Sequence, residues 1–283
     1  MNSSINKPTD LEFSITQTGI IGLGAMGLQM ARHMVAKGMS VVGYDIDAKA
    51  CAKAAEYGVV IASSLVDVAR HADVCIVMVQ SDQQVETIFS SPDLLDNLRQ
   101  GAIVCIASSI SPRLCQRLAT VGKEKRLIVL DTPVVLGQQA ANDGTMTVFV
   151  GGEERSFYRV RPVLQTFGKN VLYLGDSGSG QIAKSVNNLL LWATMTANFE
   201  ALTFARMLGA DVPRLIDALA YSSGANWSLS RWGKSTGRWA EKDMDVALDL
   251  AQELKLPMPL AALVDQMMKT INQDRMKELL TTF

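Results

Sequence analysis

The chain has 283 residues, of which 48% are hydrophobic and 19% charged, a composition typical of a globular protein with a sizeable core. Its formal net charge is −1 and it contains no basic block or acidic tail, which argues against nucleic acid and membrane surfaces as partners. The four cysteines form no C-x-x-C pair and there are only two histidines, so we expect a reducing, cytoplasmic location and no metal site.

Residues 1–16 are polar and lack the apolar core of a signal peptide, so we expect a loosely held tail. Short β-rich runs follow and alternate with helical segments, with strands expected at 18–24, 40–45, 73–80, 102–108, 126–134 and 145–152, and a helix at 25–37. After about residue 180 the pattern becomes helical, with helices expected at 181–208, 212–221 and 242–255. These patterns predict an α/β fold with a doubly wound, Rossmann-type parallel sheet at 17–178. An all-helical C-terminal domain at 179–283 follows, joined by a long interdomain helix.

That long helix is apolar but does not suggest a membrane span. Its charge-free run from Ser185 to Phe199 is 15 residues long and includes three asparagines, which makes it too short and too polar to cross a bilayer.

A glycine motif, Gly22-Leu23-Gly24-Ala25-Met26-Gly27, follows the first expected strand and opens the first expected helix. In a dinucleotide site the first glycine makes the turn, the second lets backbone approach the pyrophosphate, and the third lets helix pack on strand. The N–H groups and the positive dipole end of the helix then face the phosphates. We therefore expect this loop to bind a dinucleotide.

The acidic residue that such a site needs is Asp45, which ends the second expected strand 18 positions after Gly27. Its carboxylate can accept hydrogen bonds from ribose hydroxyls and would repel a 2′-phosphate, as would that of Asp47. No arginine follows to hold a phosphate, so NAD is favoured over NADP.

Three common dehydrogenase chemistries do not fit the residues present. The Cys/His clusters of a zinc enzyme are missing, and both histidines lie within the expected cofactor domain. None of the five tyrosines has a lysine four positions later. A lysine used directly as acid and base remains.

Lys184 suits that role because it follows Gly180 near the start of the long helix. The positive helix end, a nearby nicotinamide cation and burial each lower a lysine pKa toward neutrality, where a general acid/base works best. Asn188 lies at i+4 on the same helical face and can hold the substrate oxygen, whereas Asn187 points about 100° away and is expected to cap or pack. The competing interpretation is a surface lysine with asparagines nearby by chance.

Four stretches together resemble the β-hydroxyacid dehydrogenase family, which includes 3-hydroxyisobutyrate dehydrogenase and tartronate semialdehyde reductase. The similarity runs over about residues 17–270, and its motifs are GIIGLGAMGLQMARHM (19–34), DTPVVLGQQAANDGTMTVFVGG (131–152), GSGQIAKSVNN (178–188) and KDMDVALDLA (242–251). The resemblance implies an NAD-dependent oxidoreductase that acts on a small 3-hydroxyacid-like molecule and assembles as a homodimer or homotetramer.

The resemblance also implies roles for single residues. Lys184 would act as acid/base and Asn188 would support the substrate. The expected cofactor contacts beyond the glycine motif and Asp45 are Val79, Gln80, Ser109 and Lys242, with a weaker match at Gln84. The expected substrate contacts are Ser108, Val135, Leu136, Gly137 and Asn188.

The sequence departs from the family pattern where the substrate is expected to bind. The family's Ser-Gly-Gly is replaced by Val135-Leu136-Gly137, and Ile106 replaces an aspartate. Losing a hydrogen bond to a charged group costs about 1.5–3 kcal/mol, so a bulkier or more apolar substrate is an open alternative. Reduction of a non-carboxylate carbonyl or an imine is another, although imine reductases usually carry Asp or Tyr in place of Lys184. A non-catalytic NAD-binding protein is a third. Trp232 and Trp239 are candidates for the pocket rim, although tryptophans in such segments are most often core residues.

Overall fold

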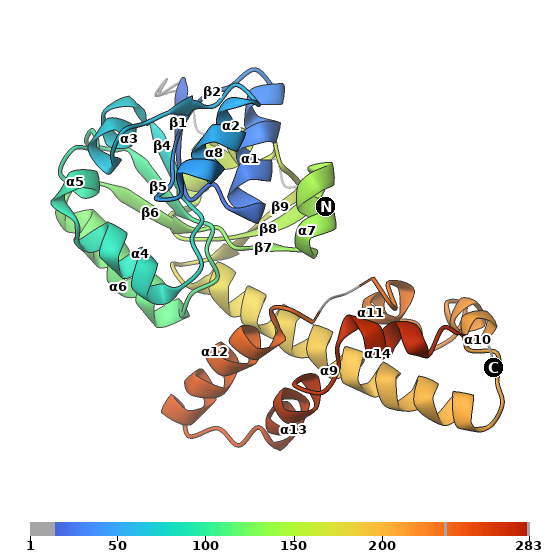
Figure 1. Cartoon of the computed structure of the whole chain (residues 1–283). Coiled ribbons are helices and arrows are strands. Elements are labelled where there is room, and N and C mark those ends of the chain that lie inside the picture. The colour runs from blue at the N-terminus through green and yellow to red at the C-terminus, as the bar shows by residue number, and fades with distance from the viewer. Residues whose placement is uncertain (1–14, 235–236, 282–283) are drawn as a thin grey trace, which may run out of the picture. The chain divides into compact units, whose positions relative to one another are not determined.

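The structure is a computed structural model that describes residues 15–234 and 237–281. It divides into two compact units, the first ending at Gln181 and the second beginning at Ile182 (Figure 1). Residues 1–14, which make up most of the expected tail, lie outside the described residues.

The first unit is built on a mixed nine-stranded sheet with the order β3-β2-β1-β4-β5-β6-β8-β7, and β9 pairs with β8. Strands β1 to β6 pair in parallel in the order of a doubly wound dinucleotide-binding sheet. The strands are β1 (Gln17–Ile21), β2 (Ser40–Tyr44), β3 (Val60–Ile61), β4 (Val74–Val77), β5 (Ile103–Ile106), β6 (Ile128–Asp131), β7 (Val134–Val135), β8 (Met146–Gly151) and β9 (Gly168–Gly175).

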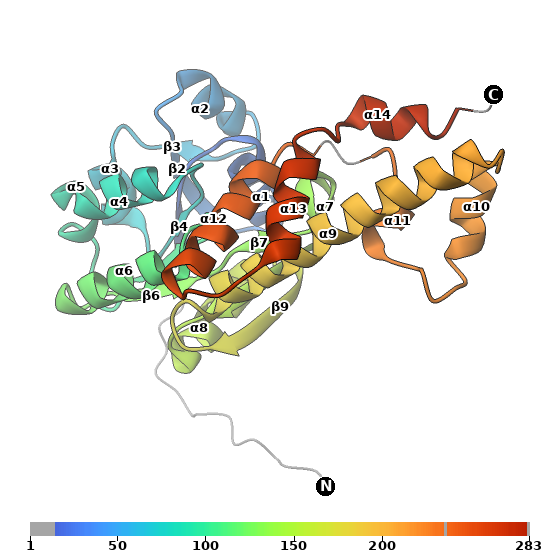
Figure 2. The same cartoon turned by 90° about the horizontal axis from the view of Figure 1, so that it is seen from below.

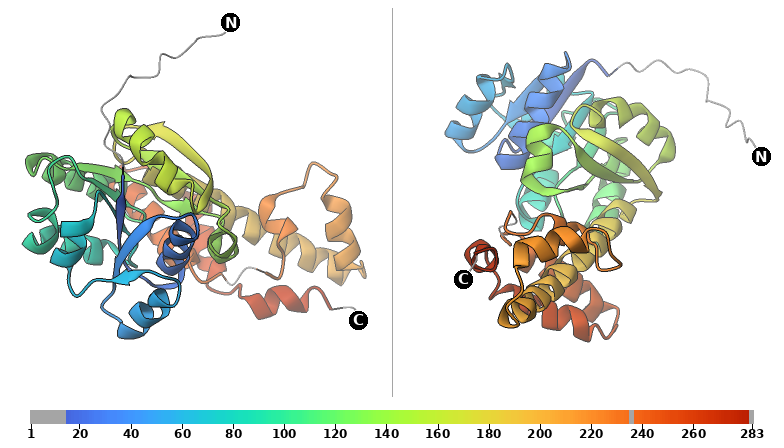
Figure 3. Two further views of the ribbon diagram at one scale, coloured as in Figure 1. Left: turned by 90° about the horizontal axis from the view of Figure 1, so that it is seen from above. Right: turned by 90° about the vertical axis from the view of Figure 1, so that its right-hand side faces the viewer.

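Helices cover both faces of this sheet (Figure 3). Strands β4 and β5 are buried along their whole length, which explains their continuous apolar runs VCIV and IVCI. The helices of the first unit are α1 (Ala25–Ala36), α2 (Ala48–Ala55), α3 (Leu65–His71), α4 (Asp82–Ser90), α5 (Pro92–Leu95), α6 (Pro112–Glu124), α7 (Gly137–Asp143) and α8 (Glu154–Leu164).

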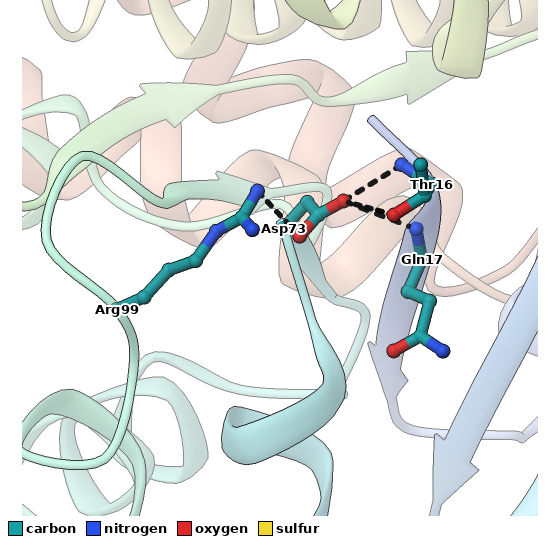
Figure 4. Close-up of polar contacts among 4 residues, drawn as sticks. All are labelled: Thr16, Gln17, Asp73 and Arg99. Carbon is teal, nitrogen blue, oxygen red and sulfur yellow. Dashed lines mark hydrogen bonds and ion pairs between the residues drawn. The ribbon is translucent and has the colours of Figure 1, made fainter. Parts of the chain in front are cut away.

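Asp73 fixes the amino end of the central strand β1 (Figure 4). Its Oδ2 accepts hydrogen bonds from the N–H and hydroxyl of Thr16, at 2.7 and 3.0 Å, and from the N–H of Gln17 at 3.2 Å. The other oxygen pairs with Arg99, whose side chain is about half exposed. The start of the sheet is thus held by one buried carboxylate.

The second unit packs around the long helix α9 (Ser179–Met207), whose first three residues belong to the first unit. Its core includes Trp192 and Met195 of α9, and Figure 2 shows α12 and α13 lying side by side. The remaining helices are α10 (Val212–Leu219), α11 (Trp227–Ser230), α12 (Ala240–Glu253), α13 (Pro259–Met268) and α14 (Gln273–Glu278). None of the helices within 15–234 and 237–281 combines the length and hydropathy that a membrane crossing requires.

The predicted fold class, a Rossmann-type sheet followed by a helical C-terminal part, is confirmed. Two details differ from the prediction. The expected strand at 126–134 is split into β6 and β7, because Pro133 between them has no N–H to donate to a ladder. Strand β8 runs antiparallel to β6 and β7, since the short α7 returns the chain in the opposite direction. The predicted domain boundary at residues 178 and 179 stays a prediction.

Candidate active site

The glycine loop after β1 needs two of its glycines for internal packing. Gly22 has φ +95°, and a Cβ there would lie 2.1 Å from the Met78 carbonyl oxygen. A Cβ on Gly27 would lie 2.0 Å from the carbonyl oxygen of Gly22. The first and third glycines therefore hold strand, turn and helix together, as predicted from their spacing.

The second glycine, Gly24, is not required by packing within the protein. A Cβ there would meet no described atom within 4 Å beyond its chain neighbours, and Gly24 and Ala25 are both exposed. The loop is therefore open where α1 begins, and the first N–H groups of a helix have no partner within it. This cradle fits a pyrophosphate at the N-terminus of the 12-residue helix α1. Leu23 is buried and Met26 packs on the core, so both offer the loop backbone rather than a polar side chain.

Asp45 lies beside this loop and is tied to it. Its Oδ2 accepts a hydrogen bond of 2.6 Å from the N–H of Leu23, and its Oδ1 accepts one of 2.8 Å from the N–H of Asp47. A carboxylate has about four acceptor positions, so capacity for ribose hydroxyls remains. The structure thus brings Asp45 and the glycine loop together at one end of the sheet.

The loops after β4 and β5 are joined by Ser108. Its hydroxyl accepts a 2.7 Å hydrogen bond from the N–H of Val79, and its side chain is fully buried. The hydroxyl therefore holds the loop after β4, while contact of Ser108 with a substrate and of Val79 with a cofactor stay predictions. The exposed Gln80 donates its N–H to Oε1 of Gln84 at 2.8 Å, and Ser109 is half-buried.

A buried network that the sequence did not reveal fixes the start of α9. Asp131, at the end of β6, accepts hydrogen bonds from the N–H of Gly178 at 2.8 Å and of Gln181 at 3.0 Å. The Gln181 amide donates to the carbonyl of Ser108 at 2.7 Å and accepts from the N–H of Ile110 at 3.2 Å. The first turn of α9 is thereby fastened to the loop after β5.

This network explains why residue 180 is a glycine. A Cβ there would lie 2.8 Å from Oδ2 of Asp131 and 2.8 Å from the carbonyl oxygen of Phe149. Burial raises the pKa of Asp131, and the N–H groups of Gly178 and Gln181 oppose that effect. Asp131 is the first residue of the 131–152 motif, so the sequence singled it out. The sequence did not show that its carboxylate binds Gly178 and Gln181.

The β7–α7 junction carries the residues expected to meet the substrate. Val135 is buried and pairs with Thr147 of β8. Leu136 has φ +83° and Gly137 has φ +71°, so a leucine occupies a left-handed conformation that favours glycine. The Leu136 side chain packs against the core of the first unit.

In the second unit, Lys184 lies within electrostatic reach of Asp243 of α12. Burial lowers the pKa of Lys184, the Asp243 carboxylate partly opposes this, and Lys242 adds to it. Burial raises the pKa of Asp243, which is countered by Lys184 and by hydrogen bonds from Trp192 and Asn188. The Trp192 Nε1–H donates to Oδ2 of Asp243 at 3.1 Å. The predicted pair Lys184 and Asn188 is thus joined by the carboxylate of Asp243, which the sequence did not indicate.

Of the other residues singled out in the sequence, Lys242 and Asn187 lie beside the group of Lys184, Asn188 and Asp243, whereas Trp232 and Trp239 have other contacts. Lys242 lies in the first turn of α12, beside Asp243. Asn187 lies about 100° round the helix from Asn188 and packs against it, since its Nδ2 donates to Oδ1 of Asn188 at 3.0 Å. Trp232 is a core residue, buried and bonded through Nε1 to the carbonyl of Met276 at 3.1 Å. Trp239 is exposed and stacks with Arg238.

Comparison with known proteins covers both units. A family profile described as the NAD binding domain of 6-phosphogluconate dehydrogenase matches residues 17–175. A second, described as NAD-binding of NADP-dependent 3-hydroxyisobutyrate dehydrogenase, matches residues 178–280. The 3-hydroxyisobutyrate dehydrogenase of Pseudomonas aeruginosa is 33% identical over 267 residues, which cover 88% of this chain and 90% of that protein.

Solved structures agree with the sequence matches. The 3-hydroxyisobutyrate dehydrogenase of Mycobacterium tuberculosis with L-serine has a TM-score of 0.84 and 26% identity, covering 93% of this chain and 95% of that one. Psf3 in complex with NADP⁺ and 2-OPP has a TM-score of 0.81 at 23% identity, covering 93% and 100%, and shows the same fold. The chain therefore has NAD(P)-binding domains and belongs to the β-hydroxyacid dehydrogenase family of oxidoreductases.

Proposed function

We propose that the protein is an NAD-dependent dehydrogenase of a 3-hydroxyacid-like substrate in which Lys184 is the general acid/base. The observation that carries this proposal is the grouping of Lys184, Asn188 and Asp243 in a unit that belongs to a family of hydroxyacid dehydrogenases. The bound nicotinamide supplies the hydride acceptor or donor, and the residues of the chain manage the proton.

Lys184 takes the proton from the substrate hydroxyl during oxidation and returns it during reduction. A lowered pKa increases the fraction of neutral amine near neutral pH, which a base requires. Asp243 limits how far that pKa falls and, with Trp192, fixes the polar surroundings of the amine. Asn188 offers an amide to the substrate oxygen.

The cofactor is held by the backbone of the glycine loop 22–27, with N–H groups donated from its later residues because those of Gly22 and Leu23 already bind Tyr44 and Asp45. Asp45 binds the ribose, and Val79, Gln80, Ser109 and Lys242 are the other proposed cofactor contacts. NAD is preferred to NADP because two carboxylates, those of Asp45 and Asp47, stand at the expected ribose end. A 2′-phosphate placed there meets like charge.

The substrate meets the chain at Val135, Leu136 and Gly137, which offer it backbone groups and no hydroxyl, because Val135 is buried and the Leu136 side chain packs on the core. This composition favours a bulkier or more apolar hydroxyacid over a small, highly polar one. A non-carboxylate carbonyl or an imine is the second candidate, motivated by the same three residues. A non-catalytic NAD-binding protein is disfavoured by the intact Lys184 and Asn188.

A homodimer or homotetramer is supported by apolar side chains exposed along α9. Ile182, Val186, Leu190, Phe204 and Leu208 are each at least half exposed in the single chain and recur at helical spacing on or just beyond this helix. Apolar surface of this kind is usually covered by a partner. A cytoplasmic location stays a prediction, supported by four cysteines that are free thiols.

The test is a spectrophotometric assay of the purified full chain. We expect NAD⁺ reduction with 3-hydroxyisobutyrate or a bulkier 3-hydroxyacid, and a lower kcat/KM with NADP⁺. Turnover of aldehydes or imines alone would favour the second candidate. NADH binding without turnover of any compound would favour the non-catalytic protein.

A further inference from the structure

Helices α1 and α7 are fastened together at the carboxyl end of α7. The Arg32 guanidinium donates to the carbonyl of Asn142 at 2.5 Å. The His33 ring nitrogen Nε2 lies 3.0 Å from the carbonyl of Ala141 and 3.1 Å from that of Asn142, a geometry in which it donates. These carbonyls belong to the last turn of α7, where a helix leaves acceptors without internal partners. The end of α7 is thus anchored on the last turns of α1.

A second attachment joins the opposite ends of the same helices. Gln138, the second residue of α7, donates from Nε2 to the carbonyl of Ala25 at 3.1 Å. Its other amide hydrogen is directed to Oδ1 of Asn142 at 2.9 Å, so both donors of the amide are used. Ala25 lies within the glycine motif and is the first residue of α1. One side chain of α7 therefore contacts the backbone of the dinucleotide loop.

Gln138 directly follows the strained part of the β7–α7 junction. Leu136 and Gly137 have consecutive left-handed backbone conformations, and α7 begins at Gly137. Helix α7 is therefore a short connection between the junction expected to meet the substrate and the loop expected to hold the pyrophosphate. The Gln138 side chain, two residues after Leu136, is in contact with Ala25 at the other end of this connection.

We propose that Gln138 is a positioning residue that holds the dinucleotide loop and couples its affinity for cofactor to the conformation of the β7–α7 junction. The proposal rests on the proposed function, in that loop 22–27 binds NAD(H). Without the Gln138 amide, the Ala25 carbonyl loses its contact with α7, and the exposed start of α1 at Gly24 and Ala25 is left with the contacts within its own loop and helix. One hydrogen bond of this exposed kind corresponds to a change in affinity of about 3- to 10-fold.

The chain offers a matched control in the next residue. Gln139 is also an exposed glutamine of α7, and its Nε2 donates to the Asp143 carboxylate at 2.9 and 3.0 Å within the same helix. Gln138→Ala and Gln139→Ala make the same chemical change at adjacent positions. Only the first removes a contact with the glycine loop.

The experiment is a fluorescence titration of the full-length apo protein with NADH, without substrate. We expect Gln138→Ala to raise the Kd for NADH about 3- to 10-fold, with Gln139→Ala within twofold of wild type and the Tm of both variants nearly unchanged. Equal Kd values for the two variants would overturn the proposal. Wild-type protein that fails to bind NADH would instead contradict the proposed function.

A double-mutant cycle with Leu136→Gly tests the coupling. Freeing residue 136 raises the Kd for NADH when Gln138 is present, and it has a smaller effect in the Gln138→Ala background, because the connection is already broken. Additive effects of the two substitutions on binding free energy would show that residue 136 acts independently of Gln138 and would refute the coupling.

Discussion

Replacing Gln181 with leucine removes one buried amide and leaves two backbone groups without a partner. The carbonyl of Ser108 loses its donor at 2.7 Å, and the N–H of Ile110 loses its acceptor at 3.2 Å. Ser108 is 0% exposed, Ile110 1% and Gln181 1%, so water does not replace the lost hydrogen bonds without local opening.

The expected cost follows from these two groups. A buried polar group without a partner costs about 1–3 kcal/mol, which gives about 2–6 kcal/mol for the pair. Leucine buries more apolar area than the amide and recovers part of this, so we expect a loss in the free energy of unfolding of at least about 2 kcal/mol. In a unit of this size that loss corresponds to a Tm lower by about 4–8 °C.

The assay is thermal unfolding together with steady-state kinetics, with Asn198→Leu as the control. Asn198 is a buried amide of α9 that donates to Asn226 and Ser228 at 2.9 Å, far along the helix from Lys184. Both variants lose stability, but only Gln181→Leu loosens the first turn of α9, so its kcat falls by about tenfold or more while the control stays near wild type. A Gln181→Leu protein with wild-type Tm and kcat would show that the Gln181 amide is not needed to hold the first turn of α9.

Two further predictions concern charge. Asp243→Asn removes the carboxylate that raises the pKa of Lys184, so that pKa falls further and the rising limb of the pH–kcat profile for oxidation moves to lower pH. A shift to higher pH would contradict this. Asp73→Ala frees the start of β1 and lowers the free energy of unfolding by about 2–4 kcal/mol in urea titrations. Asp96→Ala, which breaks an exposed 2.7 Å ion pair with Lys125, costs less than about 1 kcal/mol. Equal losses in the two variants would argue against an anchoring role for Asp73.

Much of the fold was predictable because its signals are local. The glycine motif, the apolar runs of β4 and β5 and the long helix each depend on neighbouring residues. The antiparallel direction of β8 was not predictable, since an apolar run does not encode which way its partner points. The two-residue strand β3 and the strand β9 were not predicted either. Strand β3 is too short to show a periodic pattern, whereas β9 does contain the apolar run Val171–Leu174, which was not assigned as a strand.

In the candidate site, too, residues related by local spacing were predictable and residues that meet only through tertiary packing were not. Lys184 and Asn188 share a helical face by spacing alone, and Asp45 follows a strand at the expected distance from the glycine loop. Asp243 could not be matched to Lys184, because the two lie on different helices and meet only through tertiary packing. The role of the Gln181 amide was not predictable for the same reason, because its partner Ser108 is distant in the sequence.

Whether Lys184 is the acid/base is tested by comparing wild type and Lys184→Ala in turnover and in NADH binding. The substitution removes the proposed acid/base but leaves the glycine loop and Asp45 in place. We expect kcat with a 3-hydroxyacid and NAD⁺ to fall by at least about 100-fold, with the Kd for NADH within a few-fold of wild type. A Lys184→Ala enzyme that retains near-normal turnover would contradict the proposed mechanism.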